Sequence, residues 1–147
     1  IELFAEENEP ELIQLARGFL SQLTGGRYVG VEHQRGKGGG FLVRASEGTA
    51  LPPSQLSSGT REQLYLALRM AYISHHCRQH EPLPVLMDDC FVNFDDDRMH
   101  HAIEAVGQWT GDIQTVIFSC HQRTRDAVES LLPAAKIINL QSQQERE

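Results

Sequence analysis

Apolar residues recur at helical spacing near the start of the chain and again in its middle. Between positions 10 and 23 they fall along one side of a helix, which Thr24-Gly25-Gly26 is expected to end. Between Arg61 and His76 they occur nearly all round the helix. We therefore predict two long helices, the first amphipathic and the second packed on several sides.

Shorter apolar runs predict strands. Residues 28–33 and 40–45 alternate enough to form an antiparallel pair, joined by a flexible glycine-rich loop at 36–40. After Pro84, strand and helix patterns alternate, in the order strand 85–88, helix 96–109, a strand from 115, helix 123–132 and strand 136–140. Such alternation is typical of parallel sheets. The predicted fold class is α/β, with three layers, a mainly parallel sheet, flanking helices and an N-terminal antiparallel hairpin.

Two adjacent carboxylates, Asp88 and Asp89, end the apolar run that follows Pro84. In open α/β sheets, ligands bind at the carboxyl ends of the strands. A magnesium ion takes one or two carboxylates together with substrate phosphates. The pair therefore predicts a magnesium site, although a strand that runs into a polar turn has the same pattern.

Two further segments are suited to the same kind of ligand. The central helix is preceded by Leu56-Ser57-Ser58-Gly59-Thr60, and Thr60 and Gln63 have the spacing of a capping box. Free N–H groups at a helix N-terminus, with a glycine that allows close approach, favour phosphate. The strand from Thr115 ends in Ser119-Cys120-His121, which places a histidine near the same ligand.

In this order the motifs resemble the C-terminal lobe of an ABC-type ATPase head, as found in SMC and RecF-like DNA-repair ATPases. The correspondences are Leu56 to Thr60 with the LSGGQ signature, Val85 to Asp89 with the Walker B strand, 93–95 with the D-loop, and His121 with the switch histidine. The string 88–96 is most similar to the YhaN-like branch. Residues 19–28 resemble the point where a coiled-coil arm re-enters such a head.

The resemblance implies a P-loop NTPase-like half domain that uses ATP and Mg²⁺. Asp88 would hold magnesium, mostly through water, and Asp89 would orient the attacking water. The remaining implied roles are contact of His121 with the γ-phosphate, clamping of the opposite head's ATP by Ser57, Ser58 and Gly59, and a contact of Asp95 across the dimer. Asp89 stands where ABC ATPases usually have Glu, whose side chain is longer by roughly 1.5 Å.

No Walker A motif, G-x-x-x-x-G-K-[ST], occurs in the sequence. The resemblance places that motif in an N-terminal lobe of the same protein, and a chain that starts at Ile1 without Met is expected to be an excised lobe. The implied division is 1–25 as the end of the arm, 26–140 as the lobe and 141–147 as a polar tail. Alone, the chain is expected to be inactive.

Three functions stay open. The first is ATP hydrolysis at an interface between two identical heads in a chromosome-associated or DNA-repair ATPase, with DNA bound through the full-length protein and a nuclease subunit as a further candidate partner. The second is a nucleotide-gated dimerisation module without efficient hydrolysis. The third is a magnesium-dependent nuclease or Toprim-like domain, in which Asp95-Asp96-Asp97 would help to bind metal. A zinc site at His76, Cys77 and His80 is a weaker hypothesis than a solvated helix end.

Composition agrees with one compact core, because 147 residues with 40% hydrophobic content suffice for one. The net charge of -7 argues against a main nucleic-acid surface on this chain. The three cysteines have no paired spacing, which favours reduced thiols and a cytoplasmic location. Neither a secretion signal nor a membrane span is expected.

Overall fold

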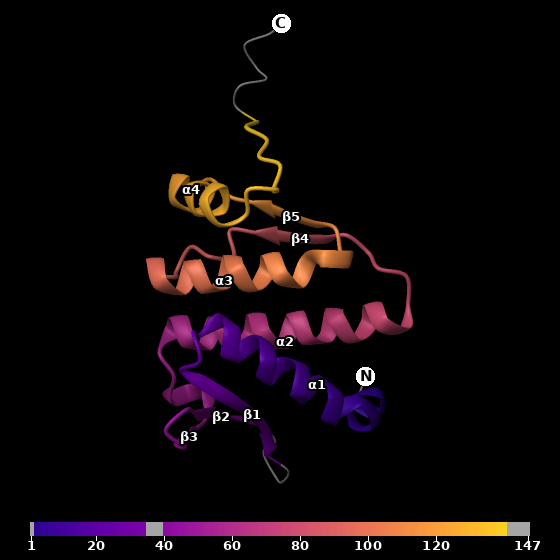
Figure 1. Cartoon of the computed structure of the whole chain (residues 1–147). Helices are drawn as coiled ribbons and strands as arrows, with labels where there is room; N and C mark the ends of the chain where they lie inside the picture. The colour runs from indigo at the N-terminus through magenta and orange to yellow at the C-terminus, as the bar shows by residue number, and fades with distance from the viewer. Residues whose placement is uncertain (1, 35–39, 141–147) are drawn as a thin grey trace, which may run out of the picture.

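The computed structural model describes residues 2–34 and 40–140. In these residues the elements are, in order, α1 (Glu2–Leu23), β1 (Tyr28–Gln34), β2 (Gly40–Ala45), β3 (Ala50–Leu51), η1 (Pro53–Gln55), α2 (Ser58–Gln79), β4 (Val85–Asp88), α3 (Asp96–Trp109), η2 (Thr110–Asp112), β5 (Thr115–Phe118) and α4 (Gln122–Leu131). Figure 1 shows them stacked from the antiparallel sheet through α1, α2 and α3 to the parallel strands and α4. The predicted α/β fold is confirmed.

The antiparallel hairpin forms as predicted, and α1 packs against it. β1 pairs with β2, and the short β3, which was not predicted, adds to the other edge of β2. Residues 36–39 of the glycine-rich loop predicted at 36–40 lie outside the described residues. Helix α1 ends at Leu23, and the following Gly25 and Gly26 adopt φ values of 57° and 79°, a region open to glycine. The predicted helix end is therefore confirmed.

Helix α2 begins three residues earlier than predicted. Ser57 is its N-cap, and the Ser57 hydroxyl accepts a hydrogen bond from the Thr60 backbone N–H. The predicted capping box of Thr60 and Gln63 is wrong, because the Gln63 side chain turns inward and donates to the backbone carbonyl of Leu23. This buried contact joins the end of α1 to the first turns of α2.

The strands β4 and β5 pair in parallel as predicted, but only one of their faces is covered. Met87 is 8% exposed, whereas Leu86 on the opposite face is 68% exposed and Phe118 is 47% exposed. Four apolar residues before two acids are typical of a parallel strand buried on both faces, but β4 is covered on one face. The predicted strand 136–140 is wrong: this segment is irregular and exposed, and it runs away from the sheet in Figure 1. Within the described residues this sheet consists of β4 and β5, so the segment 136–140 has no hydrogen-bonded strand beside it.

Helix α3 forms over its predicted range, and α4 begins one residue early. Trp109 of α3 donates its indole N–H to Ser74 of α2 at 2.7 Å. Arg123 of α4 donates to the Phe94 carbonyl at 2.8 Å, which ties α4 to the loop after β4. As a result, the carboxyl ends of β4 and β5 and the N-termini of α2 and α3 lie on one side of the molecule (Figure 1).

Candidate functional site

The two predicted acids occupy different positions at the end of β4. Asp88 is the last residue of the strand, and its side chain is exposed. Asp89 is half-buried and has a φ of 45°, in the left-handed region that non-glycine residues seldom adopt. Its backbone N–H donates to the Phe118 carbonyl at 3.0 Å. This bond continues the pairing of β4 with β5 by one residue. A positive φ at a non-glycine residue is a backbone strain that is common at functional sites.

The Asp89 carboxylate is held by residues that follow β5. Ser119 donates its hydroxyl to Asp89 Oδ1 at 2.8 Å, and the Cys120 thiol lies 3.7 Å from Oδ2. The hydrogen bond from Ser119 lowers the pKa of Asp89 below its ordinary value, against a smaller opposing effect of desolvation. Hydrogen bonds from Cys120 and the charge of His121 lower it further. Asp89 is therefore a carboxylate at neutral pH.

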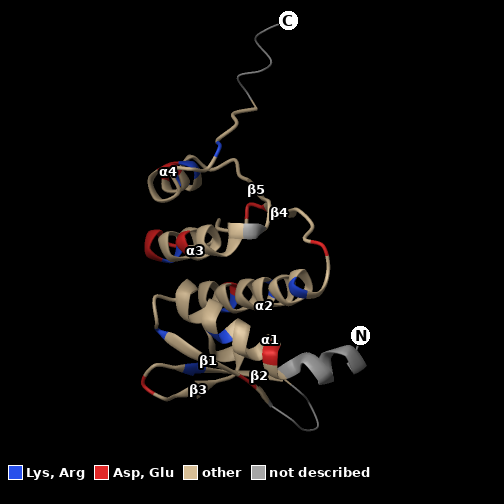
Figure 2. Cartoon of the chain, turned by 45° about the vertical axis from the view of Figure 1, so that its right-hand side comes forward, with Lys and Arg blue, Asp and Glu red and all other residues tan. Residues whose placement is uncertain are grey.

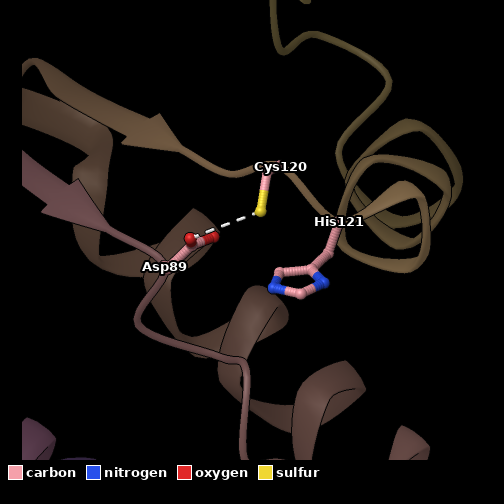
Figure 3. Close-up of side chains that lie close together, drawn as sticks. All are labelled: Asp89, Cys120 and His121. Carbon is pink, nitrogen blue, oxygen red and sulfur yellow. Dashed lines mark hydrogen bonds between the residues drawn. The ribbon is translucent and has the colours of Figure 1, made fainter.

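His121 comes from the start of α4 and faces the same space. Its backbone N–H donates to the Ser119 hydroxyl at 3.2 Å, so Ser119 contacts both residues. Figure 3 shows the His121 ring and the Cys120 thiol on the same side of Asp89. Their metal-binding atoms and that of Asp89 all lie within 4.8 Å of one another. The structure thus brings Asp89 and His121 together from the segments that follow two parallel strands.

Ser119 and Cys120 were not predicted as site residues. The sequence did contain a signal for them, because they lie between the end of a predicted parallel strand and the candidate His121. Residues in that position reach the same sheet edge as the acids of the neighbouring strand. Their actual contacts with Asp89 depend on the pairing of Asp88 with Phe118, which only the fold provides.

A second group forms around the N-termini of α2 and α3. Ser57 and Ser58 are exposed at the start of α2, and Gly59 is buried. A Cβ atom on Gly59 would lie 2.8 Å from Nη1 of Arg98, so the glycine provides room for this guanidinium. The same nitrogen of Arg98 donates to Asp95 Oδ2 at 2.9 Å. Arg98 therefore connects the predicted D-loop to the predicted signature segment.

Asp95 also caps α3, because its Oδ1 accepts the Arg98 backbone N–H at 2.9 Å. A further contact joins the predicted D-loop to α2, because the Asn93 side-chain amide donates to Glu62 Oε1 at 3.0 Å. Neither Arg98 nor Glu62 was predicted as a site residue, because a residue near the start of a helix carries no local sign of its distant partner. Asp95, predicted to reach across a dimer, has a partner within its own chain.

The remaining predicted clusters have other structural roles. Asp96 and Asp97 lie in the first turn of α3, as predicted, where negative charge stabilises a helix. Figure 2 shows acidic residues in red at this end of α3. Asp96 also pairs with Arg123 at 3.4 Å. On α2, the rings of His76 and His80 stack with centroids 4.4 Å apart.

Within the described residues, no helix combines the length and apolar character needed to cross a bilayer. No protein-family model matches the chain. The chain is similar to the uncharacterized protein YhaN of Bacillus subtilis (strain 168), with 34% identity over 135 residues. The match covers 90% of this chain but only 13% of YhaN.

Solved structures with a similar fold include SMC head domains. The SMC head domain from Thermotoga maritima gives a TM-score of 0.60 at 16% identity, over 80% of this chain and 40% of that chain. The Pyrococcus furiosus Smc head bound to the C-terminal domain of ScpA gives a TM-score of 0.62 at 12% identity, and the match covers 83% of this chain and 31% of that chain. A structure from work on ATP-driven dimerization and DNA-stimulated activation of SMC ATPases gives a TM-score of 0.67 at 11% identity. That match covers 86% of this chain and 76% of that chain. The chain thus has the fold of the C-terminal portion of an SMC head and is similar in sequence to YhaN, which confirms the predicted resemblance to an SMC- and YhaN-like ATPase head lobe.

Proposed function

We propose that this chain is the C-terminal lobe of a chromosome-associated or DNA-repair ATPase and contributes to ATP hydrolysis at an interface between two heads. The observation that carries the proposal is the meeting of Asp89 and His121 at the carboxyl ends of two parallel strands. Such strand ends are where ligands bind in α/β sheets. The similarity to SMC heads supports the same assignment.

The two groups of residues have separate roles in this proposal. Asp89 orients and polarises the attacking water, and His121 hydrogen-bonds the γ-phosphate. Ser57, Ser58 and Gly59, at the N-terminus of α2, bind phosphates of ATP held by the opposite head. Asp95 contributes to the same interface, and its bond with Arg98 holds that carboxylate next to Gly59.

Magnesium fits Asp88 better than the neighbouring cluster. Asp88 offers an exposed carboxylate at the strand end, and Mg²⁺ prefers oxygen ligands and retained waters. The thiol of Cys120 and the ring of His121 are poor magnesium ligands. When bound with ATP, the ion neutralises phosphate charge, and Asp88 would hold it mostly through water.

A lobe that carries Walker A is the proposed partner of the open side of β4 and β5. Parallel sheets are ordinarily covered on both faces, yet Leu86 and Phe118 are exposed. The same lobe would supply the phosphate-binding loop that this sequence lacks. Basic residues are spread over several elements in Figure 2, and the chain has a net charge of -7, so DNA contact is assigned to other parts of the full-length protein. A nuclease subunit remains a candidate partner.

A nucleotide-gated dimerisation module is the second candidate, and the Asp89 carboxylate favours it. This side chain is short, and both of its oxygens already face partners, Ser119 and Cys120. A carboxylate whose oxygens are bound by its own chain is less available to orient the attacking water. The nuclease hypothesis loses support from Asp95 and Asp96, because both acids pair with arginines.

The deciding experiment uses this lobe combined with its Walker A lobe. Asp89→Asn keeps the shape of the side chain but cannot act as a base, so turnover should fall about 10²–10⁴-fold while ATP-dependent dimerisation persists. Asp126→Asn, an exposed aspartate on α4, is the matched control. Unchanged turnover in Asp89→Asn would remove Asp89 from the proposed chemistry. A parent head that dimerises with ATP but does not hydrolyse it would favour the dimerisation module.

A further inference from the structure

Soft metal ligands gather beside Asp89. Within the part of the chain that the structure describes, one group of three metal-capable side chains occurs, formed by Asp89, Cys120 and His121. Their ligand atoms lie within 4.8 Å of one another, and Figure 3 shows the carboxylate, thiol and imidazole arranged around a common space. One oxygen, one sulfur and one nitrogen donor can therefore reach a single ion.

This donor set matches zinc rather than magnesium. Zn²⁺ binds thiolate, imidazole and carboxylate ligands, and sites with three protein ligands leave a fourth position for water. With bond lengths of about 2.0–2.3 Å, the ligand atoms of a tetrahedral zinc site lie roughly 3–4 Å apart. The Cys120 sulfur already lies 3.7 Å from Asp89 Oδ2, and all three atoms lie within 4.8 Å of one another, so side-chain rotations can bring them to this separation.

The surroundings orient the carboxylate and leave the cluster open to an ion. Ser119 holds Asp89 Oδ1 at 2.8 Å, which keeps Oδ2 turned toward the Cys120 thiol. Hydrogen bonds of this kind fix metal ligands in position and raise metal affinity. Cys120 and His121 are exposed, so an ion can enter from solvent.

We infer that Asp89, Cys120 and His121 form a zinc-binding site that inhibits ATP hydrolysis when it is filled. The inhibition rests on the proposed function, because Asp89 and His121 are the groups assigned to the attacking water and the γ-phosphate. While they hold the ion, they are not available for these roles. Cys120, which has no part in the proposed hydrolysis, supplies the ligand that selects zinc over magnesium.

The first test is calorimetric titration of zinc chloride into the 147-residue chain. One zinc ion should bind per chain with a dissociation constant of about 1 μM or lower, and Cys120→Ser should weaken binding at least about tenfold. Cys77→Ser, on α2, is the matched control and should bind zinc like the parent. Cobalt in place of zinc should give a thiolate-to-cobalt charge-transfer band that disappears in Cys120→Ser and persists in Cys77→Ser.

Three results would overturn the site. The first is that the parent chain takes up no zinc, and the second is that Cys120→Ser binds zinc as tightly as the parent. The third is that His80→Ala loses zinc binding, which would mean that the stacked His76 and His80 hold the ion. Since Cys120 is exposed, its replacement should leave the circular dichroism spectrum unchanged, and His121→Ala gives an independent loss of one ligand.

The second test measures ATP turnover of the combined head with Mg-ATP, with and without zinc. Zinc should lower turnover of the parent, and the ratio of the two rates should approach one in Cys120→Ser whatever its basal rate. Equal zinc inhibition of parent and variant would overturn the inhibitory role. The two proposals fail separately: zinc binding by a head without ATPase activity contradicts only the proposed hydrolysis, and an active head that binds no zinc contradicts only this site.

Discussion

The two sheets of this protein differ in how completely the chain covers them. In the antiparallel sheet, Val31 and Val43 are fully buried beneath α1, which also packs against α2. In the parallel pair, Leu86 and Phe118 remain exposed beside the buried Met87. The apolar surface of the first region is buried by other elements of the same chain. The second presents an apolar face next to the candidate site, which is the arrangement expected where another lobe completes the sheet.

The largest expected effect is on the free energy of unfolding, when a leucine is replaced by alanine in each of the two regions. Leu20→Ala, at a position with 0% exposure, should lower the free energy of unfolding by about 2–5 kcal/mol. Leu86→Ala, at 68% exposure, should change it by no more than about 0.5 kcal/mol. Urea unfolding followed by circular dichroism measures both. Equal losses would show that the open face is covered within this chain.

Ser57→Arg extends the comparison to a polar surface, the N-terminus of α2, which is proposed to contact the opposite head. In combined heads with ATP and magnesium, the arginine should weaken dimerisation at least about tenfold, because its bulk and charge occupy the proposed contact. ATP binding to each single head should persist. Sedimentation separates the two effects, with Ser46→Arg in the exposed hairpin turn as the control. An undiminished dimer would remove Ser57 from the interface.

The cap of α3 gives a smaller effect that separates two contacts of one side chain. Asp95→Ala removes both the cap and the pair with Arg98, and should cost about 1 kcal/mol of unfolding free energy. Asp95→Asn keeps a capping oxygen and loses an exposed ion pair, so it should cost less than about 0.5 kcal/mol. Thermal or urea unfolding distinguishes the variants. If Asn costs as much as Ala, the pair with Arg98 contributes more than the cap.

The smallest effect concerns the protonation of Asp89. Its hydrogen bonds lower its pKa, so they favour the folded state above the ordinary pKa, and this contribution disappears as pH falls through the lowered value. Ser119→Ala removes the largest cause and should raise the pKa of Asp89, so that protonation occurs at higher pH. A carbon-13 NMR titration of the carboxylate measures the change, with Ser46→Ala as control. An unchanged pKa would assign the effect to other groups.

Cys90 and Cys120 both lie close to the candidate site, but they differ in burial. Burial raises the pKa of Cys90 to about 11, so this thiol stays protonated at neutral pH. Cys120, on the adjacent strand end, is exposed. Two cysteines that look alike in sequence, each next to a motif residue, therefore have different access to ions.

Apart from the short β3 and the wrongly predicted strand 136–140, the sequence by itself determined the order of the elements and the edge at which the candidate residues meet. Local patterns suffice for this, because helical and strand periods are properties of short segments. The parallel pairing of the strands after Pro84 then follows from their alternation with helices, and it brings Asp89 and His121 to one edge.

Only the tertiary structure decided which surfaces are covered and which side chains contact one another. The exposure of Leu86, the inward turn of Gln63 toward Leu23, and the position of Arg98 over Gly59 all depend on residues distant in the chain. An apolar strand looks the same in sequence whether one face or both are covered. Its burial, like the contact of Cys120 with Asp89, depends on which elements pack beside it, and local sequence does not encode that.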